Sequence, residues 1–229
     1  MTESPAKIGV LDLQGGVQEH LEHFERVGVD AVPVKRAEEL PGLAGLVLPG
    51  GESTCLSRLM RIFHIDEAIL NEYRRGLRIW GTCAGAILLA ADIEGEKPHL
   101  GLVDMSLRRN AFGSQLDSFQ WSGPVPGITD NAVELTFIRA PKILRVGPDV
   151  HVILRIGEYV AAAEQDGILV TVFHPELTPT LAFHRYFATA CGWTTTGVCP
   201  DVAGPDWNRE AWMSRSRIAR PASVGGRRQ

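Results

Sequence analysis

The sequence predicts a single α/β domain built on a doubly wound, mostly parallel sheet with helices on both faces. Apolar runs typical of buried strands alternate with helical patterns through the first ninety residues. These apolar runs lack polar alternation, which indicates that both faces of the sheet are covered. Parallel strands also need crossover connections, usually helices, so the alternation of the two patterns favours this architecture.

The elements of the first half can be placed one by one. Residues 7–13, KIGVLDL, read as a buried strand, and the apolar side chains of residues 17–27 recur at helical spacing before Gly28 ends that helix. Asp66 can cap a helix that ends at Gly76. Further strands are expected at 30–35, 44–50 and 77–81.

In the second half the pattern changes to short strands separated by turns, which we expect to extend or decorate the same sheet. Residues 159–177 predict two strands joined by a hairpin turn at Asp166-Gly167, and residues 181–192 predict a closing helix. The predicted domain therefore spans residues 1–192. Residues 193–229 are rich in Thr, Pro, Gly and Arg and are expected to be a partly disordered tail, with a docking or anion-binding arm as the alternative.

Composition excludes several classes of function. The 229 residues carry a net charge of −4, so a polyanionic partner such as nucleic acid is not expected. No segment is long and apolar enough to span a bilayer, and the N-terminus lacks the basic and apolar regions of a signal peptide. These features predict a cytoplasmic protein with no membrane partner.

The four cysteines are predicted to be free thiols. They lie far apart and form no C-x-x-C pair, which argues against a zinc site and a disulfide framework, so no metal is expected. Their positions are Cys55, Cys83, Cys191 and Cys199.

Cys83 stands apart from the other cysteines because it lies between two glycines where an apolar strand turns into a small-residue helix, RIWGTCAGAILLA. This G-x-C-x-G stretch has the pattern of a nucleophile elbow, in which Gly81 and Gly85 allow a tight turn and the cysteine projects from its apex. The N-terminus of the helix that begins at Ala84 favours a thiolate. From the elbow alone, a small buried hydrophobic residue is an equal alternative.

Two further stretches favour nucleophilic chemistry. In FHPEL, His174 ends an apolar strand and Glu176 can turn its carboxylate toward the imidazole, which gives a base and the group that orients it. In LPGGEST, the glycines expose backbone N–H groups suited to an oxyanion hole. The other histidines lack such a setting and are interpreted as ordinary polar residues: His20, His23, His64, His99, His151 and His184.

Taken together, these motifs resemble the class I, triad-type glutamine amidotransferases, and more narrowly the glutaminase subunits of pyridoxal 5′-phosphate synthase. G-x-C-x-G with H-P-E carries the broader resemblance. The narrower one depends on LDLQGGVQEH, LPGGEST, GTCAGAILLA, RRNAFGSQLDSF, FIRAPKI and FHPELT followed by FHRYF. The resemblance covers residues 7–192.

The resemblance implies hydrolysis of L-glutamine to glutamate and ammonia, without a cofactor, and delivery of the ammonia to a barrel-type synthase subunit in a large complex. It implies that Cys83 forms a glutamyl thioester, that His174 transfers the proton and that Glu176 orients His174. The implied oxyanion donors are the N–H groups of Gly51 and Ala84. The implied substrate-binding residues are Gly51, Glu52, Ser53, Arg109, Ile138 and Arg139, and Gln14, Gly15 and Gly16 are implied to face the partner.

The sequence departs from the family pattern at two positions. Ser114 and Gln120 stand where a basic and an acidic residue are expected, which suggests that an ion pair of relatives is absent. Three alternatives stay open at this point: a glutaminase of another class I amidotransferase, such as imidazole glycerol phosphate synthase; a non-catalytic regulator that keeps the elbow cysteine; and a cysteine peptidase of similar fold.

Overall fold

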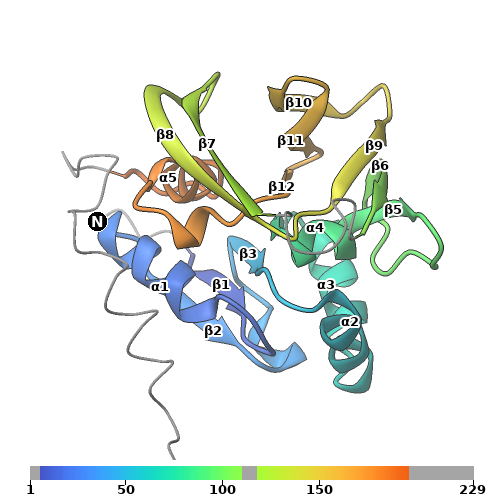
Figure 1. Cartoon of the computed structure of the whole chain (residues 1–229). Helices are drawn as coiled ribbons and strands as arrows, with labels where there is room; N and C mark the ends of the chain where they lie inside the picture. The colour runs from blue at the N-terminus through green and yellow to red at the C-terminus, as the bar shows by residue number, and fades with distance from the viewer. Residues whose placement is uncertain (1–5, 110–117, 196–229) are drawn as a thin grey trace, which may run out of the picture.

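The structure, a computed structural model, describes residues 6–109 and 118–195 (Figure 1). Ser114 and Cys199 lie outside these residues. The strands are β1 (Ile8–Leu11), β2 (Ala31–Val34), β3 (Gly45–Leu48), β4 (Arg78–Thr82), β5 (Ala90–Ile93), β6 (Val103–Arg108), β7 (Ser118–Val125), β8 (Thr129–Ile138), β9 (Lys142–Val146), β10 (His151–Ile156), β11 (Tyr159–Gln165) and β12 (Ile168–Thr171). The helices are α1 (Val17–Arg26), α2 (Ser53–Ile62), α3 (Ile65–Arg74), α4 (Ala84–Leu89) and α5 (Ala182–Ala190), with 3₁₀ turns η1 (Ala37–Glu39) and η2 (Pro175–Leu177).

One large sheet organises the molecule. Its strands follow the order β2-β1-β3-β4-β12-β11-β9-β6-β5, with β10 paired to β11. The pairs from β2 to β12 are parallel, as is β5 with β6, whereas β11 pairs antiparallel with β12, β10 and β9. The predicted fold class is therefore confirmed, and the second half does extend the same sheet.

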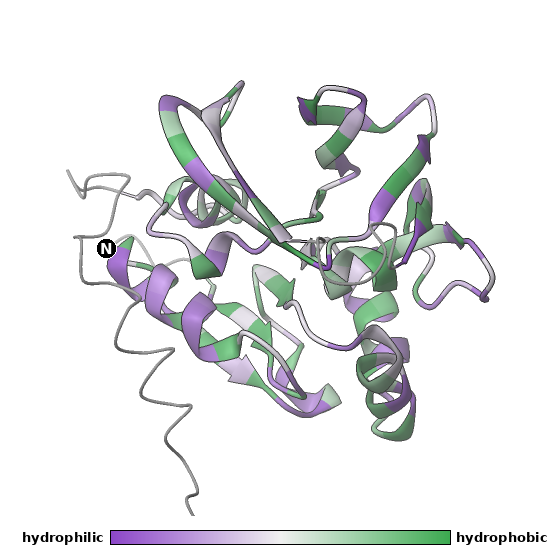
Figure 2. Cartoon of the chain, viewed as in Figure 1, coloured by the Kyte–Doolittle hydropathy of each residue, from purple (hydrophilic) through white to green (hydrophobic). Residues whose placement is uncertain are grey.

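Helices cover both faces of the parallel part of the sheet. Figure 1 shows α1 and α5 on one side of the central strands and α2, α3 and α4 on the other. The strands β1, β3 and β12 are buried along their whole length, as their unbroken apolar sequences require. Figure 2 shows hydrophilic residues along much of α1 and hydrophobic residues on β3.

A separate hairpin, β7–β8, stands outside the large sheet. It pairs antiparallel over most of its length, and Phe119 stacks on Phe137 with ring centroids 4.3 Å apart. The backbone N–H of His174 donates to the Thr136 carbonyl at 2.9 Å, which ties the segment after β12 to this hairpin. The hairpin thus braces one side of the carboxyl edge of the sheet.

Local details differ from the sequence expectations at the start of α3 and in the length of α4. Asp66 is not an N-cap, because α3 begins at Ile65 directly after His64, which adopts a left-handed conformation with φ 53°. Glu52 caps α2 by accepting from the N–H groups of Thr54 and Cys55. The helix after Cys83 is also shorter than its sequence suggests, since residues 90–93 form β5.

The predicted hairpin at Asp166-Gly167 is confirmed. Both residues have positive φ, 49° and 80°, between the antiparallel strands β11 and β12. Among the described residues, no helix has both the length and the apolar character needed to cross a membrane.

Candidate active site

A pocket of about 560 Å³ lies at the carboxyl ends of β1, β3, β4 and β12. Ligands of open α/β folds bind at this edge, where loops lead into helix N-termini. Every site residue predicted from the sequence lines this pocket. They are Gly51, Glu52, Ser53, Cys83, Ala84, Arg109, Ile138, Arg139, His174 and Glu176.

Cys83 occupies a strained turn between β4 and α4. Its φ and ψ are 47° and −98°, a conformation that non-glycine residues rarely adopt and that costs about 1–3 kcal/mol. A Cβ at Gly85 would lie 2.0 Å from the Leu48 carbonyl oxygen, and one at Gly81 would lie 2.6 Å from a methyl group of Leu89. Only glycine fits at either position, so the turn has the construction of a nucleophile elbow.

Cys83 is only 7% exposed, yet it lines the pocket. Its thiol lies 4.0 Å from the Ile138 carbonyl oxygen at the end of β8. The thiol is therefore screened from bulk water while it stays open to a small ligand in the pocket.

His174 and Glu176 are placed by the segment that follows β12. The His174 Nδ1 lies 2.8 Å from Glu176 Oε1, and the Glu176 side chain is 1% exposed. Because Nδ1 is engaged with the carboxylate, Nε2 is the nitrogen left for the hydrogen bond with Cys83. Cysteine, imidazole and carboxylate thus form a continuous chain.

The charge state of His174 follows from its neighbours. Burial opposes the imidazolium, but the Glu176 carboxylate and the hydrogen bond to Cys83 together raise the pKa of His174 well above its usual value. His174 in turn keeps the pKa of Glu176 below its usual range despite complete burial. The pair is therefore arranged to hold a proton on the imidazole and a charge on the carboxylate.

The loop after β3 brings backbone groups to the same place. A Cβ at Gly50 would lie 2.4 Å from the His174 ring. The close approach of this loop to the imidazole therefore requires glycine at position 50. The Gly50 carbonyl accepts from the Gly16 N–H at 3.3 Å, which directs the N–H of Gly51 the opposite way across the planar peptide. Ala84 is the first residue of α4, so the helix does not use its N–H.

The outer side of the pocket is built from ion pairs. Arg109 lies 3.2 Å from Glu52 and 3.0 Å from Glu96, and it also contacts the Thr54 hydroxyl at 3.1 Å. These side chains are between about a quarter and a half exposed. Arg139 directly follows β8 and has a positive φ of 45°, next to Ile138, which is 36% exposed.

Three residues of this region were missed as site residues by the sequence analysis. Glu96 pairs with Arg109, and the Gln14 side-chain oxygen accepts from the Glu52 N–H at 2.9 Å. His20, interpreted above as an ordinary polar residue, is fully buried with its Nε2 3.5 Å from Glu176 Oε2. Its position at helical spacing between Val17 and Phe24, on the apolar face of α1, was the available signal.

Comparison with known proteins gives a consistent result. The model of the SNO glutamine amidotransferase family matches residues 10–192. The chain belongs to this family. The resemblance inferred from its motifs is therefore confirmed.

Members of the family with curated names are similar along nearly their whole length. A protein of Syntrophus aciditrophicus named pyridoxal 5′-phosphate synthase subunit PdxT is 58% identical over 208 residues, which cover 90% of this chain and 92% of the relative. One of the same name from Clostridium botulinum is 47% identical over 183 residues, covering 79% and 95%. A crystal structure described as glutamine amidotransferase superposes with a TM-score of 0.77 at 41% identity, over 81% of this chain and 99% of that one.

Proposed function

We propose that this family member is the glutaminase subunit of a pyridoxal 5′-phosphate synthase. It hydrolyses the side-chain amide of L-glutamine through Cys83, His174 and Glu176, and it supplies the ammonia to a barrel-type synthase subunit in a hetero-oligomer. The observation that carries the proposal is the chain of contacts from the Cys83 thiol through His174 to the buried Glu176 carboxylate, at the wall of one pocket. The names of the relatives support the choice of pathway.

The reaction begins with attack of the Cys83 sulfur on the amide carbon of glutamine. His174 holds the thiol proton, and the resulting imidazolium is stabilised by Glu176. As the carbonyl π bond opens, its oxygen becomes an oxyanion, for which the N–H groups of Gly51 and Ala84 are the proposed donors. One such donor is worth about 3 kcal/mol of transition-state stabilisation.

Collapse of this intermediate breaks the carbon–nitrogen bond. His174 gives its proton to the departing nitrogen, so ammonia leaves and a glutamyl thioester stays on Cys83. A water molecule then attacks the thioester carbon while His174 accepts its proton. The carbon–sulfur bond then breaks, and the glutamate that is released gives the remaining proton of its new carboxyl group to water. Cys83 is left as a thiolate beside protonated His174, which restores the starting state.

Substrate selection is assigned to the outer side of the pocket. The planar fork of Arg109 suits the α-carboxylate of glutamine, and the acidic Glu52 suits its α-ammonium group. Gly51, Ser53, Ile138 and Arg139 complete the surroundings of the substrate. The pocket volume of about 560 Å³ fits an amino acid with bound water.

The test is glutamate release from glutamine, measured with and without the barrel-type synthase subunit from the same organism. The proposal expects release that requires the wild-type chain and rises when the synthase is added. Cys83→Ala is expected to abolish release while the variant still folds and still binds the synthase. Release by Cys83→Ala at the wild-type rate would refute the mechanism, and release that never couples to pyridoxal 5′-phosphate formation would refute the assignment of the partner.

A further inference from the structure

Glu176 has two carboxylate oxygens, and the triad uses only one of them. We propose that His20 is a positioning residue that holds the second oxygen, Oε2, so that Oε1 stays directed at His174. This inference depends on the proposed function, because it concerns how the Glu176 carboxylate of the same triad is kept oriented toward His174. His20 itself lies behind the triad and does not line the pocket.

The surroundings of Glu176 show why a second partner is needed. The carboxylate is 1% exposed, and Oε2 makes no hydrogen bond of ordinary length to any of the described residues. His20 Nε2 lies 3.5 Å from Oε2. A Cβ at Gly16 would lie 3.0 Å from Oε1, so the start of α1 fixes the carboxylate from the other side. A buried carboxylate oxygen without a donor is costly, which makes the identity of the atom facing it important.

Hydrogen bonding between two helices decides which nitrogen of His20 carries its proton. His20 Nδ1 lies 2.8 Å from His184 Nε2, so one of these atoms donates and the other accepts. If His20 donated, its Nε2 would turn a lone pair toward the Glu176 carboxylate, and the buried His184 Nδ1–H would have no acceptor within the described residues.

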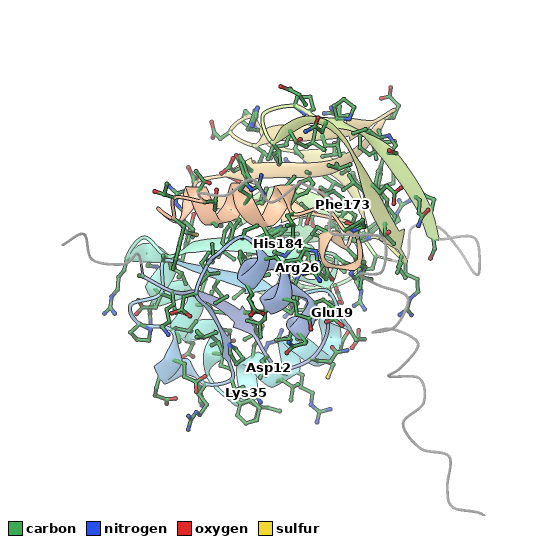
Figure 3. The ribbon with its side chains drawn as sticks, turned by 90° about the vertical axis from the view of Figure 1, so that its left-hand side faces the viewer. Asp12, Glu19, Arg26, Lys35, Phe173 and His184 are labelled. Atoms are coloured by element: carbon green, nitrogen blue, oxygen red, sulfur yellow. The ribbon has the colours of Figure 1, made fainter. Side chains whose placement is uncertain are left out.

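The reverse arrangement removes both problems. His184 Nε2–H donates to His20 Nδ1, and His20 Nε2–H then faces Glu176 Oε2, sharing its proton with the Thr82 hydroxyl 3.4 Å away. His184 Nδ1 is left as an acceptor, which is less costly to bury alone than a donor. Figure 3 shows His184 where α5 meets α1, the helix that also carries Glu19 and Arg26.

The titratable groups around Glu176 come from three segments. They are His174 from its own segment, His20 and His23 from α1, and His184 from α5 behind His20. Burial lowers the pKa of His20 to about 4 and that of His184 well below its usual value. Both rings are therefore neutral near pH 7, so His20 acts on Glu176 as a hydrogen-bond donor. Among the described residues, no three His, Cys, Asp or Glu side chains are arranged to hold a metal ion.

The experiment compares His20→Leu with His20→Gln. Leucine removes the donor, whereas the glutamine amide nitrogen can occupy the position of Nε2 and restore it. The first readout is the pH dependence of Cys83 alkylation by iodoacetamide, followed by peptide mass spectrometry, with the exposed Cys55 as an internal reference. The second is kcat and KM for glutamine hydrolysis by the complex with the synthase subunit.

In His20→Leu the Glu176 carboxylate loses a donor, becomes protonated at higher pH and then no longer stabilises the imidazolium. We expect the acid limb of Cys83 alkylation to move up by about one pH unit. We expect kcat to fall about tenfold with KM unchanged, since the substrate does not touch His20. His20→Gln is expected to restore most of both. His23→Leu, a buried histidine of the same helix that bonds backbone carbonyls, is the matched control and should leave the acid limb in place.

Each outcome decides the inference. A folded His20→Leu with a wild-type acid limb overturns it, as does a His20→Gln variant that is as impaired as His20→Leu. If His20→Leu does not fold, His20→Asn replaces it, because the shorter amide reaches only the position of Nδ1 and cannot donate to Glu176. The alkylation profile does not require turnover, so a wild-type chain that failed to hydrolyse glutamine would refute the proposed function and leave this readout intact.

Discussion

The two sides of the pocket are built in opposite ways. The inner wall, defined here as Cys83, His174 and Glu176, is almost completely buried, and its groups are fixed by backbone strain, close packing and short hydrogen bonds. The outer rim, defined as Arg109 with Glu52 and Glu96, is partly exposed, and long flexible side chains form it.

This difference separates two tasks. Groups that transfer protons and form a covalent bond need fixed geometry, which a packed interior supplies. Side chains that bind a charged amino acid can change conformation as the substrate binds, because they lie at the surface. We therefore expect changes to the inner wall to lower kcat and changes to the outer rim to raise KM.

The strongest test of the inner wall is His174→Asn. The asparagine amide nitrogen can take the place of Nδ1 and keep the hydrogen bond to Glu176, so the variant loses only the nitrogen that faces Cys83. We expect kcat for glutamine hydrolysis by the complex to fall by about 10²- to 10⁴-fold, the usual cost of losing a positioned base. Glutamate release under saturating glutamine measures this. A loss of less than tenfold in a variant with wild-type thermal stability would contradict the role of His174.

A second prediction concerns the polar interior behind the inner wall. His20, His23 and His184 are buried, and burial is the main cause that lowers the pKa of each of them. Between about pH 6.5 and 4 the unfolded chain binds protons at these sites and the folded chain does not, so stability must fall as the pH falls through this window. His20 alone, with its pKa lowered to about 4, corresponds to about 3 kcal/mol. His174 does not offset this loss, because its raised pKa contributes stability that is lost only as the pH rises above its unfolded value.

The measurement is the thermal unfolding midpoint by circular dichroism from pH 7.5 to 4.5. We expect a steep decline toward acid that is shallower in His20→Gln, which has one fewer buried imidazole. His151, exposed at the start of β10, provides the control, and His151→Gln should keep the wild-type slope. Equal slopes in all three proteins would show that the buried histidines do not govern acid stability.

Sequence reasoning succeeded where the signal was local. Gly81 and Gly85 identify the elbow in the sequence, because a Cβ at either position would clash with the turn itself or with the neighbouring strand β3. FHPEL likewise places His174 and Glu176 two residues apart at a strand end, and the structure brings them within 2.8 Å. The fold class was also predictable, because unbroken apolar runs that alternate with helices are compatible with few other architectures.

It failed where distant segments meet. His20 faces Glu176 only because α1 packs against the η2 turn that follows β12, and no spacing in the sequence encodes that contact. The pairing of Arg109 with Glu96 also depends on how the segment after β5 folds back beside β6. Asp66 has a side chain suited to capping, but it does not cap α3. The left-handed His64 is the N-cap instead, so the helix begins at Ile65, shortly after the end of α2.

The last prediction tests the outer rim through Arg109→Gln. The substitution removes a charged partner of the substrate carboxylate, and a hydrogen bond to a charged group is worth about 1.5–3 kcal/mol, so KM should rise about 10- to 100-fold while kcat changes little. Steady-state glutamine hydrolysis by the complex measures both constants. Arg108→Gln is the matched control, because Arg108 is an exposed neighbour that pairs with Glu94 outside the pocket. This substitution should change neither KM nor kcat, since solvent screens an exposed ion pair of this kind. If Arg109→Gln instead lowered kcat as far as it raised KM, the outer rim would share the chemistry, and the division between the two sides of the pocket would be wrong.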